Sequence, residues 1–593
     1  MPTEITLDSD QRRAVRTSAR AVVVVAGAGT GKTEVVARRV ERLLQSSPDE
    51  AFRVLALSYT VKAADELKAR FHERLGDLHR RVDTDTIHGF ALSLLRKFGT
   101  RIGLPTEPEI LTRNEDRAEV LMSWLEEGRH PDPLTSFDEL FARLDLARAR
   151  CEPAPYLEEW REALDGAGAL DFPSMLDRAC ELLEGSWAQR HLQRLYDHVI
   201  VDEAQNLTPA QYELIRRVIG EPGSDHLNVV IVGDERQSIV TFAGADPELI
   251  SRFAKEYDAE RIELHRNYRS AERIIQVGRS IAEALEQPTP PFGAEYAALG
   301  TIELAEAEDE PAEGRLVADW VSSLLEEGLD EAAVAPGESV RIQPEEIACL
   351  SRSGAALRYT REALNERSIE NASASTEDDW VRSVAARLLV EIAAFHSAPD
   401  HRSTQRRMES ILGNSESTWD DPQSVLVDSG RPELAQFFGS QDPMDLLEVA
   451  NGIDIDDPDW SDDLQQLNDA MQLFVDRTDV ADRTFGNFRQ HIARCQRGDS
   501  LDPGVRLLTV HKAQGQEFRA VAVIACNEGQ FPDFRAETEE ELTSELRTFY
   551  VAVSRPTRML LLTRALSRST RFGSRRTASS KFLGYLPRSV LHA

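Results

Sequence analysis

The first apolar segment of the sequence has the pattern of a buried parallel strand that leads into a helix. Residues 21–25 read AVVVV, a continuous and mostly β-branched run, and a glycine-rich loop follows it directly. From Glu34 to Leu44 the apolar residues recur at helical spacing. A strand covered on both faces needs an unbroken apolar run, whereas a surface helix needs one apolar stripe. We therefore predict a strand, a loop and an amphipathic helix in an α/β domain.

Two later apolar segments also have the pattern of strands, and each of them ends in polar residues. The segment HVIVDEAQNL carries Asp202 and Glu203, and LNVVIVGDERQSI carries Asp234 and Gln237. An isolated Asp–Glu pair is more often a solvated turn. Open α/β sheets, however, bind their ligands at the carboxyl ends of the strands. The position of these side chains at strand ends therefore favours a shared site.

The composition is typical of a globular protein with several domains. The chain has 593 residues, of which 41% are hydrophobic, and this length predicts about three to five domains. No apolar run approaches the roughly 20 residues that cross a bilayer, and the N-terminus lacks the pattern of a signal peptide. The five cysteines include no CxxC pair, which argues against a zinc or iron–sulfur site. We expect a cytoplasmic protein with reduced thiols.

The net charge of −33 does not by itself favour nucleic acid as a ligand. The charge is unevenly distributed, however. Residues 547–593 contain ten Lys or Arg and no Asp or Glu, whereas residues 301–346 contain fourteen acids and two Arg. A basic end on an acidic body leaves room for a local basic groove despite the overall sign.

The segment GAGTGKT after the first strand matches the loop pattern that cradles phosphates. Its glycines let backbone N–H groups face the phosphate oxygens. Lys32 is expected to reach the β- and γ-phosphates, and Thr33 is expected to hold Mg²⁺. A chance match is the alternative, which the flanking strand and helix disfavour. The predicted ATP-binding loop comprises Ala26, Gly27, Ala28, Gly29, Thr30, Gly31, Lys32 and Thr33.

The strand-end side chains supply the groups that ATP hydrolysis needs. Asp202 is placed to bind Mg²⁺, directly or through water. Glu203 is placed to take a proton from the attacking water. Gln237 carries a neutral amide that can contact the γ-phosphate and report its loss. Three strand-end motifs of this kind predict a RecA-like ATPase.

Further segments in a fixed order narrow the class of ATPase. They are LDSDQRRAV, LSYTVKAADELKARF, TDTIHGFALSLLRKFG, DEAQNLTPAQYELI, VGDERQSIVTFAGADP, LHRNYRS, LLTVHKAQGQEF, EGQFPD and ELRTFYVAVSRPTRM. In order and spacing this set resembles the superfamily 1A DNA helicases of the UvrD/Rep group. The resemblance covers the chain from about Leu7 to Leu562. It implies an α/β fold with two RecA-like P-loop motor domains, each with a parallel sheet and each interrupted by a mainly helical insertion.

The resemblance assigns further residues around the nucleotide. Gln11 would read the adenine edge, Tyr268 would stack on the base and Glu517 would contact the ribose. Arg269 and Arg555 match two arginine fingers, which reach the γ-phosphate across a cleft. A guanidinium keeps its proton and stabilises charge on the transferring phosphoryl group. An arginine from the second domain therefore makes hydrolysis conditional on closure of the cleft.

The resemblance also implies a track for single-stranded DNA. Aromatic faces stack on any base, so the grip of such a track tolerates any sequence. The matching positions are Tyr59, Thr60, His88, Phe90, Phe242, Thr509 and His511. Packing in a core is the equal alternative for Phe90 and for Phe242.

Several positions depart from the family pattern. Val61 replaces a common asparagine, Val240 a usual aromatic residue and Ala243 a usual arginine. Gln514 stands for a usual lysine and Asn206 for a usual aspartate, and Glu34 follows GKT where many relatives are basic. None of these positions is in the hydrolytic core, so we expect ATPase activity. The loss of an aromatic residue and two cations along the track affects grip, step coupling and unwinding strength.

The motif positions also predict how the domains are interrupted. The first motor domain is predicted at residues 1–95 and 195–265, with a helical insertion at 96–194. The second motor domain is predicted at residues 266–385 and 503–593, with a reduced, acidic helical insertion at 386–502.

Two stretches outside the motor motifs have unusual charge. GIDIDDPDWSDD in the second insertion contains six aspartates, and its spacing does not match an EF-hand loop, so a solvated acidic loop is favoured over a calcium site. An acidic loop repels phosphates, which favours a protein partner there, such as a nuclease or a repair factor. The basic tail SRSTRFGSRRTASS is either a mobile arm, a phosphate contact or a solubilising end.

Two functions of different class follow from these predictions. The first is an ATP-dependent 3′-to-5′ translocase and helicase on single-stranded DNA or a single–double-strand junction, in repair, recombination or related DNA processing. The alternative is a nucleotide-gated DNA sensor that regulates a partner nuclease, for example in anti-phage defence, with weak unwinding of its own. RNA as the track is less favoured, because the motif set resembles DNA enzymes. Robust strand displacement by the isolated protein would separate the first two.

Overall fold

The computed structural model describes residues 7–373 and 503–587, apart from 48, 107, 112–113, 126–135, 224–226, 286–292, 295–297 and 571–572. Between these two ranges it describes residues 391–392, 395 and 443–452 and scattered positions up to 488. The chain divides into two compact units. One comprises Met1–Ala372 and Asp502–Ala593, and the other is Ser373–Leu501.

The second unit overlaps most of the insertion predicted at 386–502. Helix α18 (Pro443–Gly452) lies in it. Residues 453–463, which hold the six aspartates, lie outside the described residues. The acidic loop and its protein partner therefore stay predictions.

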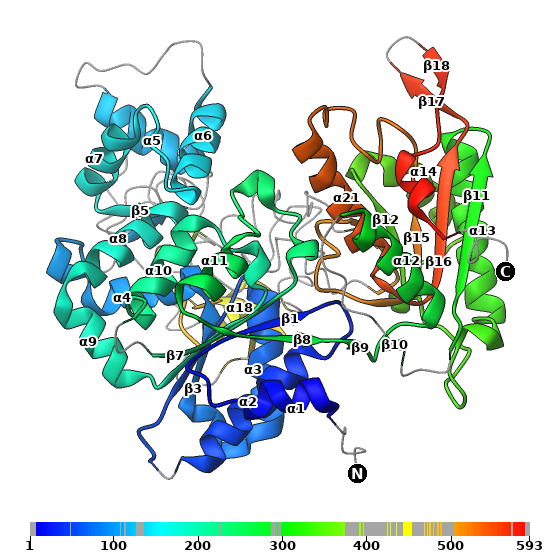
Figure 1. The fold of residues 1–593 in the computed structure, drawn as a ribbon. Coiled ribbons are helices and arrows are strands. Elements are labelled where there is room, and N and C mark those ends of the chain that lie inside the picture. Colours follow the sequence, from blue (N-terminus) through cyan, green and yellow to red (C-terminus); the bar gives the residue numbers. More distant parts are fainter. Residues whose placement is uncertain are drawn as a thin grey trace. The chain divides into compact units, whose positions relative to one another are not determined.

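The first sheet has six parallel strands in the order β3-β2-β6-β7-β1-β8 (Figure 1). The strands are β1 (Ala21–Ala26), β2 (Val54–Ser58), β3 (Val82–Thr86), β6 (His198–Val201), β7 (Asn228–Gly233) and β8 (Glu260–Leu264). Side chains alternate along β1, so Val22 and Val24 join the core on one face, whereas Val23 and Val25 join the core on the other. The apolar run at 21–25 is thus buried on both sides, as predicted.

Helices cover both faces of this sheet. One face is covered by α1 (Ser9–Arg16), α2 (Lys32–Ser46) and α3 (Val61–Leu75), and the other by α4 (Ile87–Phe98), α10 (Pro209–Ile219) and α11 (Leu249–Glu256). Four of these helices begin at a capping side chain. Asp8, Thr60, Thr86 and Thr208 each accept a hydrogen bond from the backbone N–H three residues later.

The residues between α4 and β6 are mainly helical, as predicted for this insertion. They form α5 (Asn114–Leu125), α6 (Phe137–Ala149), α7 (Leu157–Ala167), α8 (Phe172–Glu184) and α9 (Ser186–Leu195), with the short parallel pair β4 (Glu109–Leu111) and β5 (Ala169–Asp171). A buried carboxylate holds them together. Asp171 accepts hydrogen bonds from Arg148 at 3.0 Å, from Arg117 at 3.1 Å and from Trp160 Nε1 at 2.9 Å. A buried charge needs such complete pairing.

A second six-stranded sheet has the order β11-β16-β15-β12-β14-β13. Its strands are β11 (Thr301–Ala307), β12 (Ile347–Ser351), β13 (Asn371–Ser373), β14 (Val505–Thr509), β15 (Phe518–Val523) and β16 (Pro556–Ala565). The pairs among β11, β16, β15, β12 and β14 are parallel. Around it lie α12 (Glu272–Ala284), α13 (Glu310–Glu327), α14 (Arg358–Glu366) and α21 (Glu539–Val553). The predicted α/β class with parallel sheets is confirmed.

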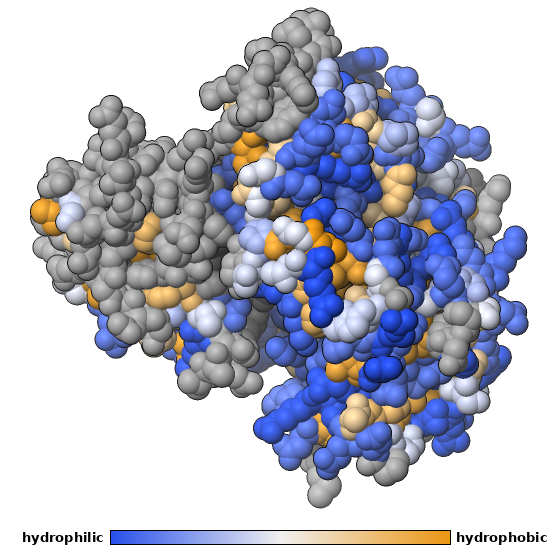
Figure 2. Space-filling model, turned by 90° about the vertical axis from the view of Figure 1, so that its left-hand side faces the viewer, coloured by the Kyte–Doolittle hydropathy of each residue, from blue (hydrophilic) through white to orange (hydrophobic). Residues whose placement is uncertain are grey.

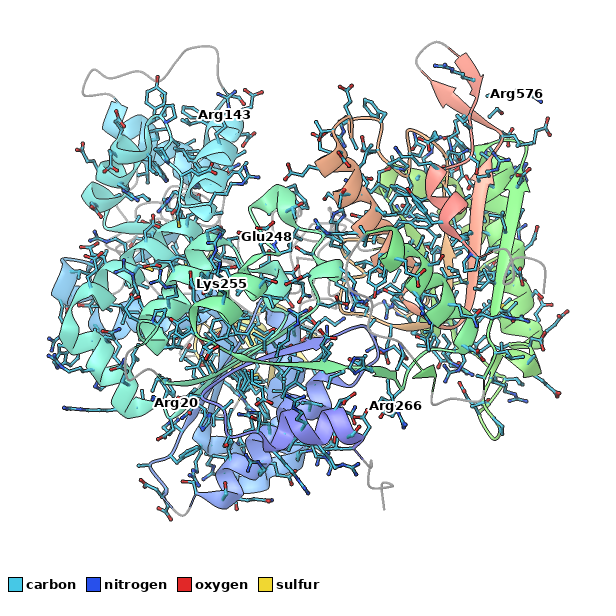
Figure 3. The ribbon with its side chains drawn as sticks, viewed as in Figure 1. Arg20, Arg143, Glu248, Lys255, Arg266 and Arg576 are labelled. Atoms are coloured by element: carbon cyan, nitrogen blue, oxygen red, sulfur yellow. The ribbon has the colours of Figure 1, made fainter. Side chains whose placement is uncertain are left out.

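The basic tail is a folded hairpin over most of its length. Strands β17 (Ser567–Thr570) and β18 (Gly573–Arg576) pair antiparallel, and Arg576 on β18 is labelled in Figure 3. Arg568 anchors the hairpin, because its buried guanidinium donates to Glu310 and Glu313 of α13. Among the residues that the structure describes, no helix is long and apolar enough to cross a bilayer.

Candidate nucleotide site and nucleic-acid track

The loop after β1 has the conformation and the close contacts that only glycine permits. Gly29 and Gly31 have φ values of +73° and +80°, in the left-handed region. A Cβ at Gly31 would lie 2.9 Å from Gln11 Nε2, and a Cβ at Gly29 would lie 2.7 Å from Asn267 Oδ1. Any larger side chain would therefore collide with the neighbouring side chains that pack on the loop. Helix α2 begins directly at Lys32, so its positive N-terminal end also faces this loop.

The end of β6 brings two carboxylates to the same edge as the loop. Lys32 Nζ lies 3.3 Å from Glu203 Oε1, and Glu203 adopts a left-handed backbone with φ of 54°. Burial, together with the neighbouring charge of Glu203, raises the pKa of Asp202 to about 7. Burial alone would also raise the pKa of Glu203, but Lys32 and a hydrogen bond from Gln205 outweigh it and lower that pKa. The carboxyl group of Asp202 is therefore harder to ionise than that of Glu203.

These groups fit a nucleotide with a divalent cation. The buried Asp202 carboxylate and the Thr33 hydroxyl are oxygen donors of the kind Mg²⁺ prefers. A cation beside Asp202 would offset the burial and the charge of Glu203, which together raise the pKa of its carboxyl group. The glycine-lined loop and Lys32 provide matching N–H and ammonium donors for phosphate.

The end of β7 adds a buried polar cluster. Asp234 accepts hydrogen bonds from Arg236 Nε at 2.6 Å and from Gln237 Nε2 at 2.8 Å. The side chain of Gln205 links this cluster to the β6 end, because its Oε1 accepts from the backbone N–H of Asp234 at 3.1 Å. Hydrogen bonds therefore connect the ends of β6 and β7, and Gln237 belongs to the same network.

The second sheet contributes Arg555, which lies between α21 and β16. Its guanidinium is 1% exposed and donates to Gln237 Oε1 at 3.2 Å, to the carbonyl of Val551 at 3.0 Å and to the carbonyl of Gln516 at 3.1 Å. Burial, reinforced by the charge of Arg269, lowers the pKa of Arg555 to about 10, so the group stays protonated at neutral pH. A hydrogen bond thus connects Gln237, which follows β7 of the first sheet, with Arg555, which precedes β16 of the second.

A second contact between the sheets involves two of the residues that depart from the family pattern. Gln514 Nε2 donates to Asn206 Oδ1 at 3.2 Å and to the backbone carbonyl of Gln237 at 3.1 Å. The expected lysine and aspartate would form a charged pair here. In this chain the contact is a neutral amide pair.

The segment that holds Tyr268 and Arg269 lies directly on the phosphate loop. The N–H of Tyr268 donates to the carbonyl of Gly29 at 2.8 Å, and its hydroxyl donates to Asp8 Oδ2 at 2.6 Å. Gln11 Nε2 donates to the carbonyl of Thr30 at 3.0 Å. Arg269 forms an ion pair with Glu517, the residue directly before β15. Gln11 and Tyr268 thus border the loop, and Arg269 follows them and pairs with Glu517; the roles of these residues toward a nucleotide stay predictions.

Sequence reasoning did not identify Asn267 as a site residue. Its Nδ2 donates to the carbonyl of Ala28 at 2.8 Å, and its Oδ1 accepts from the N–H groups of Arg269 and Ser270 at 2.8 and 2.9 Å. The amide therefore positions Arg269 against the loop. The one signal was its place in the quoted NYRS motif.

The departure at Glu34 has a structural explanation. Its carboxylate is buried and accepts from Arg38 at 2.8 Å, from Arg70 at 3.3 Å and from Arg74 at 2.6 Å. Arg38 lies one turn further along α2, whereas Arg70 and Arg74 lie on α3. Glu34 thus ties the helix after the phosphate loop to the helix after β2. It contacts no residue of the nucleotide site among these partners.

Four of the predicted track residues lie at the carboxyl ends of β2 and β14 or just beyond them, and a fifth, Phe242, lies on the short helix Thr241–Ala243. Phe242 is 67% exposed, and its ring meets that of His511 edge-on at 5.4 Å and 83°. Tyr59 and Thr60 follow β2, and Thr509 ends β14. The exposed Thr60 caps α3, whereas burial raises the pKa of Tyr59. The ring contact between Phe242 and His511 connects a segment after β7 of the first sheet with one after β14 of the second. Ala243, beside Phe242, is exposed.

The remaining two track residues lie on α4. His88 packs edge-on against Phe172 at 5.9 Å, and burial lowers its pKa to about 4, so it is neutral at physiological pH. Phe90 is 6% exposed and belongs to the core beneath the first sheet, with Ile87 and Leu94 on the same helix face. Its ring has no free face for a base, so the structure favours the core-packing alternative for this residue.

Comparisons with known proteins agree with this arrangement. A family model described as the UvrD/REP helicase N-terminal domain matches residues 7–258, and one described as the UvrD-like helicase C-terminal domain matches residues 449–567. The chain is 25% identical to an ATP-dependent DNA helicase PcrA of Staphylococcus epidermidis, over 99% of this chain and 87% of that protein. It is 26% identical to UvrD1 of Mycobacterium tuberculosis, over 99% and 85%. It is 27% identical to DNA helicase II of Escherichia coli, over 98% and 87%.

Proposed function

The chain belongs to the UvrD-type superfamily 1A helicases, and from this premise we propose that it is an ATP-dependent 3′-to-5′ translocase and helicase on single-stranded DNA. The observation that carries the proposal is the buried contact between Arg555 and Gln237. It brings a cation from the second sheet to a residue beside the nucleotide site of the first. Hydrolysis at such a site depends on the relative position of the two sheets, which is the requirement for a motor.

We propose the following roles in hydrolysis. Lys32, Arg269 and Arg555 neutralise the charge that develops on the transferring phosphoryl group. Glu203 takes the proton of the attacking water, and Gln237 contacts the γ-phosphate. When phosphate oxygens take over Lys32, the cation that lowers the pKa of Glu203 turns away, and its carboxylate becomes a stronger base. Thr33 and Asp202 would hold Mg²⁺, which supplies charge neutralisation.

The remaining residues hold the nucleotide and the strand. Gln11, Tyr268 and Glu517 are proposed to bind the adenosine part of ATP. The exposed ring of Phe242, with His511 behind it, is proposed to stack on bases, and Tyr59, Thr60, His88 and Thr509 are proposed to line the same track. We leave Phe90 out of this surface because it is buried.

We also propose the domain boundaries predicted from the motifs. The first motor domain then comprises 1–95 and 195–265 and carries the insertion at 96–194. The second comprises 266–385 and 503–593 and carries the insertion at 386–502. The two six-stranded sheets support this division.

The base assignment is tested with Glu203→Gln. We expect loss of ATP turnover with retained nucleotide binding, because the amide keeps the shape of the side chain and cannot accept a proton. Glu213→Gln is the matched control, since Glu213 is a half-exposed glutamate of α10 that pairs with Arg216 and Arg217. Unchanged hydrolysis in Glu203→Gln would refute the role of Glu203.

Direction is tested with two duplexes that differ only in the polarity of a single-stranded tail. Displacement of the strand on the 3′-tailed duplex, and not on the 5′-tailed one, is the expected result. Displacement on the 5′-tailed duplex alone would contradict the proposed direction.

A second candidate is a DNA-gated ATPase that unwinds weakly and acts with a partner. The observation that favours it is the weakened track, where the exposed Ala243 replaces a cation beside Phe242 and the Gln514–Asn206 pair is neutral. DNA-stimulated hydrolysis without strand displacement by the isolated protein would support this candidate over the first.

A further inference from the structure

A basic patch lies at the end of α4 and along α9, in the first compact unit and separate from the predicted track. It consists of Lys97, Arg101, Arg190 and Arg194 around Trp187 and His191. Helix α4 carries His88 near its start and Lys97 near its end. The 12 residues of this helix span about 18 Å. The track residue His88 and the basic patch therefore lie toward opposite ends of α4. Figure 2 shows the side of the molecule on which α9 lies in Figure 1. Hydrophilic residues dominate the coloured surface of this view.

Stacked rings fix the centre of the basic patch. Trp187 is 40% exposed, and the guanidinium of Arg101 lies 3.8 Å from its ring centroid. The ring of His191 is stacked at 5.3 Å and an interplanar angle of 10°. The ring of Phe98 packs edge-on against that of Trp187, with 5.2 Å between the ring centroids. The ring thus holds Arg101 in a set position, which reduces the entropy that this side chain loses on binding.

Helical spacing places the α9 members on one face. Positions 187, 190, 191 and 194 are separated by three or four residues, so their side chains are neighbours on the helix surface. Arg190 and Arg194 are exposed. Within the part of the chain that the structure describes, Lys97, Arg101, Arg190 and Arg194 form no ion pair.

The surrounding acids are already paired. Glu181 and Glu184 of the neighbouring α8 bind Arg178 and Arg217 at 2.7 and 3.1 Å. On a protein of net charge −33, four exposed cations without ion-pair partners among the described residues form a local positive field. Such a field attracts polyanions and is screened by salt.

We propose that the basic patch is a second contact for DNA, which binds the phosphates of a single strand outside the motor track. The inference rests on the proposed function, because the ligand is the same DNA. Arg101 and His191 occupy the region over the Trp187 ring, so the basic patch recognises phosphate and does not stack on bases. Its named members are four cations around a ring that Arg101 and His191 cover, whereas the central anchor of a protein partner needs an open apolar pocket. Nucleic acid is therefore the ligand that its chemistry fits.

The test compares Arg190→Glu/Arg194→Glu with Arg358→Glu/Arg361→Glu on α14, which changes the net charge equally. Binding of a single strand of about 40 nucleotides is measured over a range of salt concentration, and ATPase stimulation by an oligonucleotide of about 8 nucleotides is measured in parallel. We expect the α9 variant to bind the long strand at least 10-fold more weakly, with a salt slope lower by about 1.4, the value for two lost phosphate contacts. Stimulation by the short strand should not change.

The outcomes separate the two proposals. A salt slope and affinity equal to those of the α14 variant would overturn the basic patch as a DNA contact. Loss of binding to a poly-glutamate peptide, with DNA binding intact, would make it a protein-docking surface and would equally overturn the inference. Failure of any single strand to stimulate the wild-type ATPase would instead refute the proposed function. Lys97→Gln/Arg101→Gln, on α4 and the turn after it, provides a second variant if the α9 variant does not fold.

Discussion

Gln514 is predicted to couple the two sheets through its contact with Asn206. Its amide donates to Asn206 and to the backbone carbonyl of Gln237, and the side chain of Gln237 accepts from Arg555. A change at residue 514 therefore reaches both the end of β6 and Arg555, the proposed arginine finger. We predict that Gln514→Lys and Asn206→Asp are each harmful alone and compensate each other when combined.

The magnitude follows from burial and charge. Asn206 is 2% exposed, so Asn206→Asp alone buries a carboxylate without a cation, which costs about 3 kcal/mol or more. A lysine at 514 supplies that cation, and a hydrogen bond between charged groups contributes about 1.5–3 kcal/mol. The expected coupling in the double variant is therefore about 2 kcal/mol, or roughly 30-fold in kcat/KM for DNA-stimulated hydrolysis.

The assay is a double-mutant cycle on kcat/KM for ATP with saturating single-stranded DNA. Gln516→Ala is the matched control, because the amide of Gln516 donates to the carbonyl of Lys512 within its own loop. It should have little effect. Effects of the two substitutions that add to within about 0.5 kcal/mol would refute the coupling.

Four further predictions concern single residues. Arg555→Ala should abolish ATP turnover and leave DNA affinity unchanged, and loss of DNA binding in a filter assay would argue against its role as an arginine finger. Phe242→Ala should weaken binding of single strands by about 1–3 kcal/mol, the value of one stacked base, without changing basal hydrolysis; an unchanged fluorescence titration would remove Phe242 from the track. Glu34→Gln should lower the local stability of α2 and α3 by about 2–3 kcal/mol, measured by amide hydrogen exchange, and unaltered exchange would show that the three arginine contacts contribute nothing. Burial lowers the pKa of His198 from 6.5 to about 4, so the unfolded chain binds the proton first, and the stability that this residue contributes is present above pH 6.5 and is lost as the pH falls toward 4; His198→Phe should remove at most about 3 kcal/mol of this acid sensitivity, and an unchanged pH profile of unfolding would contradict the burial argument.

Strand ends were predictable from the sequence because local pattern determines them. The unbroken apolar run before Gly27 and the runs before Asp202 and Asp234 specify buried strands, and a parallel sheet brings their carboxyl ends to one edge. The loop glycines, Lys32, Glu203 and Gln237 are consequently close in space.

Contacts between distant segments were not predictable in the same way. Gln514 and Asn206 are 308 residues apart, and a single sequence carries no local signal for their contact. Phe90 shows a different limit, since a motif match gives a residue type and not the direction in which it points. Its place beside Ile87 and Leu94 on the apolar face of α4 decides that it is buried. The hairpin β17–β18 depends on Arg568 reaching Glu313 of α13, which composition alone does not reveal.

Each cation that the proposal gives to the triphosphate already has a partner within the protein. Lys32 pairs with Glu203, Arg269 pairs with Glu517 and Arg555 donates to Gln237. A nucleotide that enters therefore exchanges partners with the protein, and its net affinity is the difference between two sets of charged contacts. On release, the internal partners take these three cations back. This exchange of partners favours rapid turnover over tight binding, which suits the proposed motor because it must release its product in every cycle.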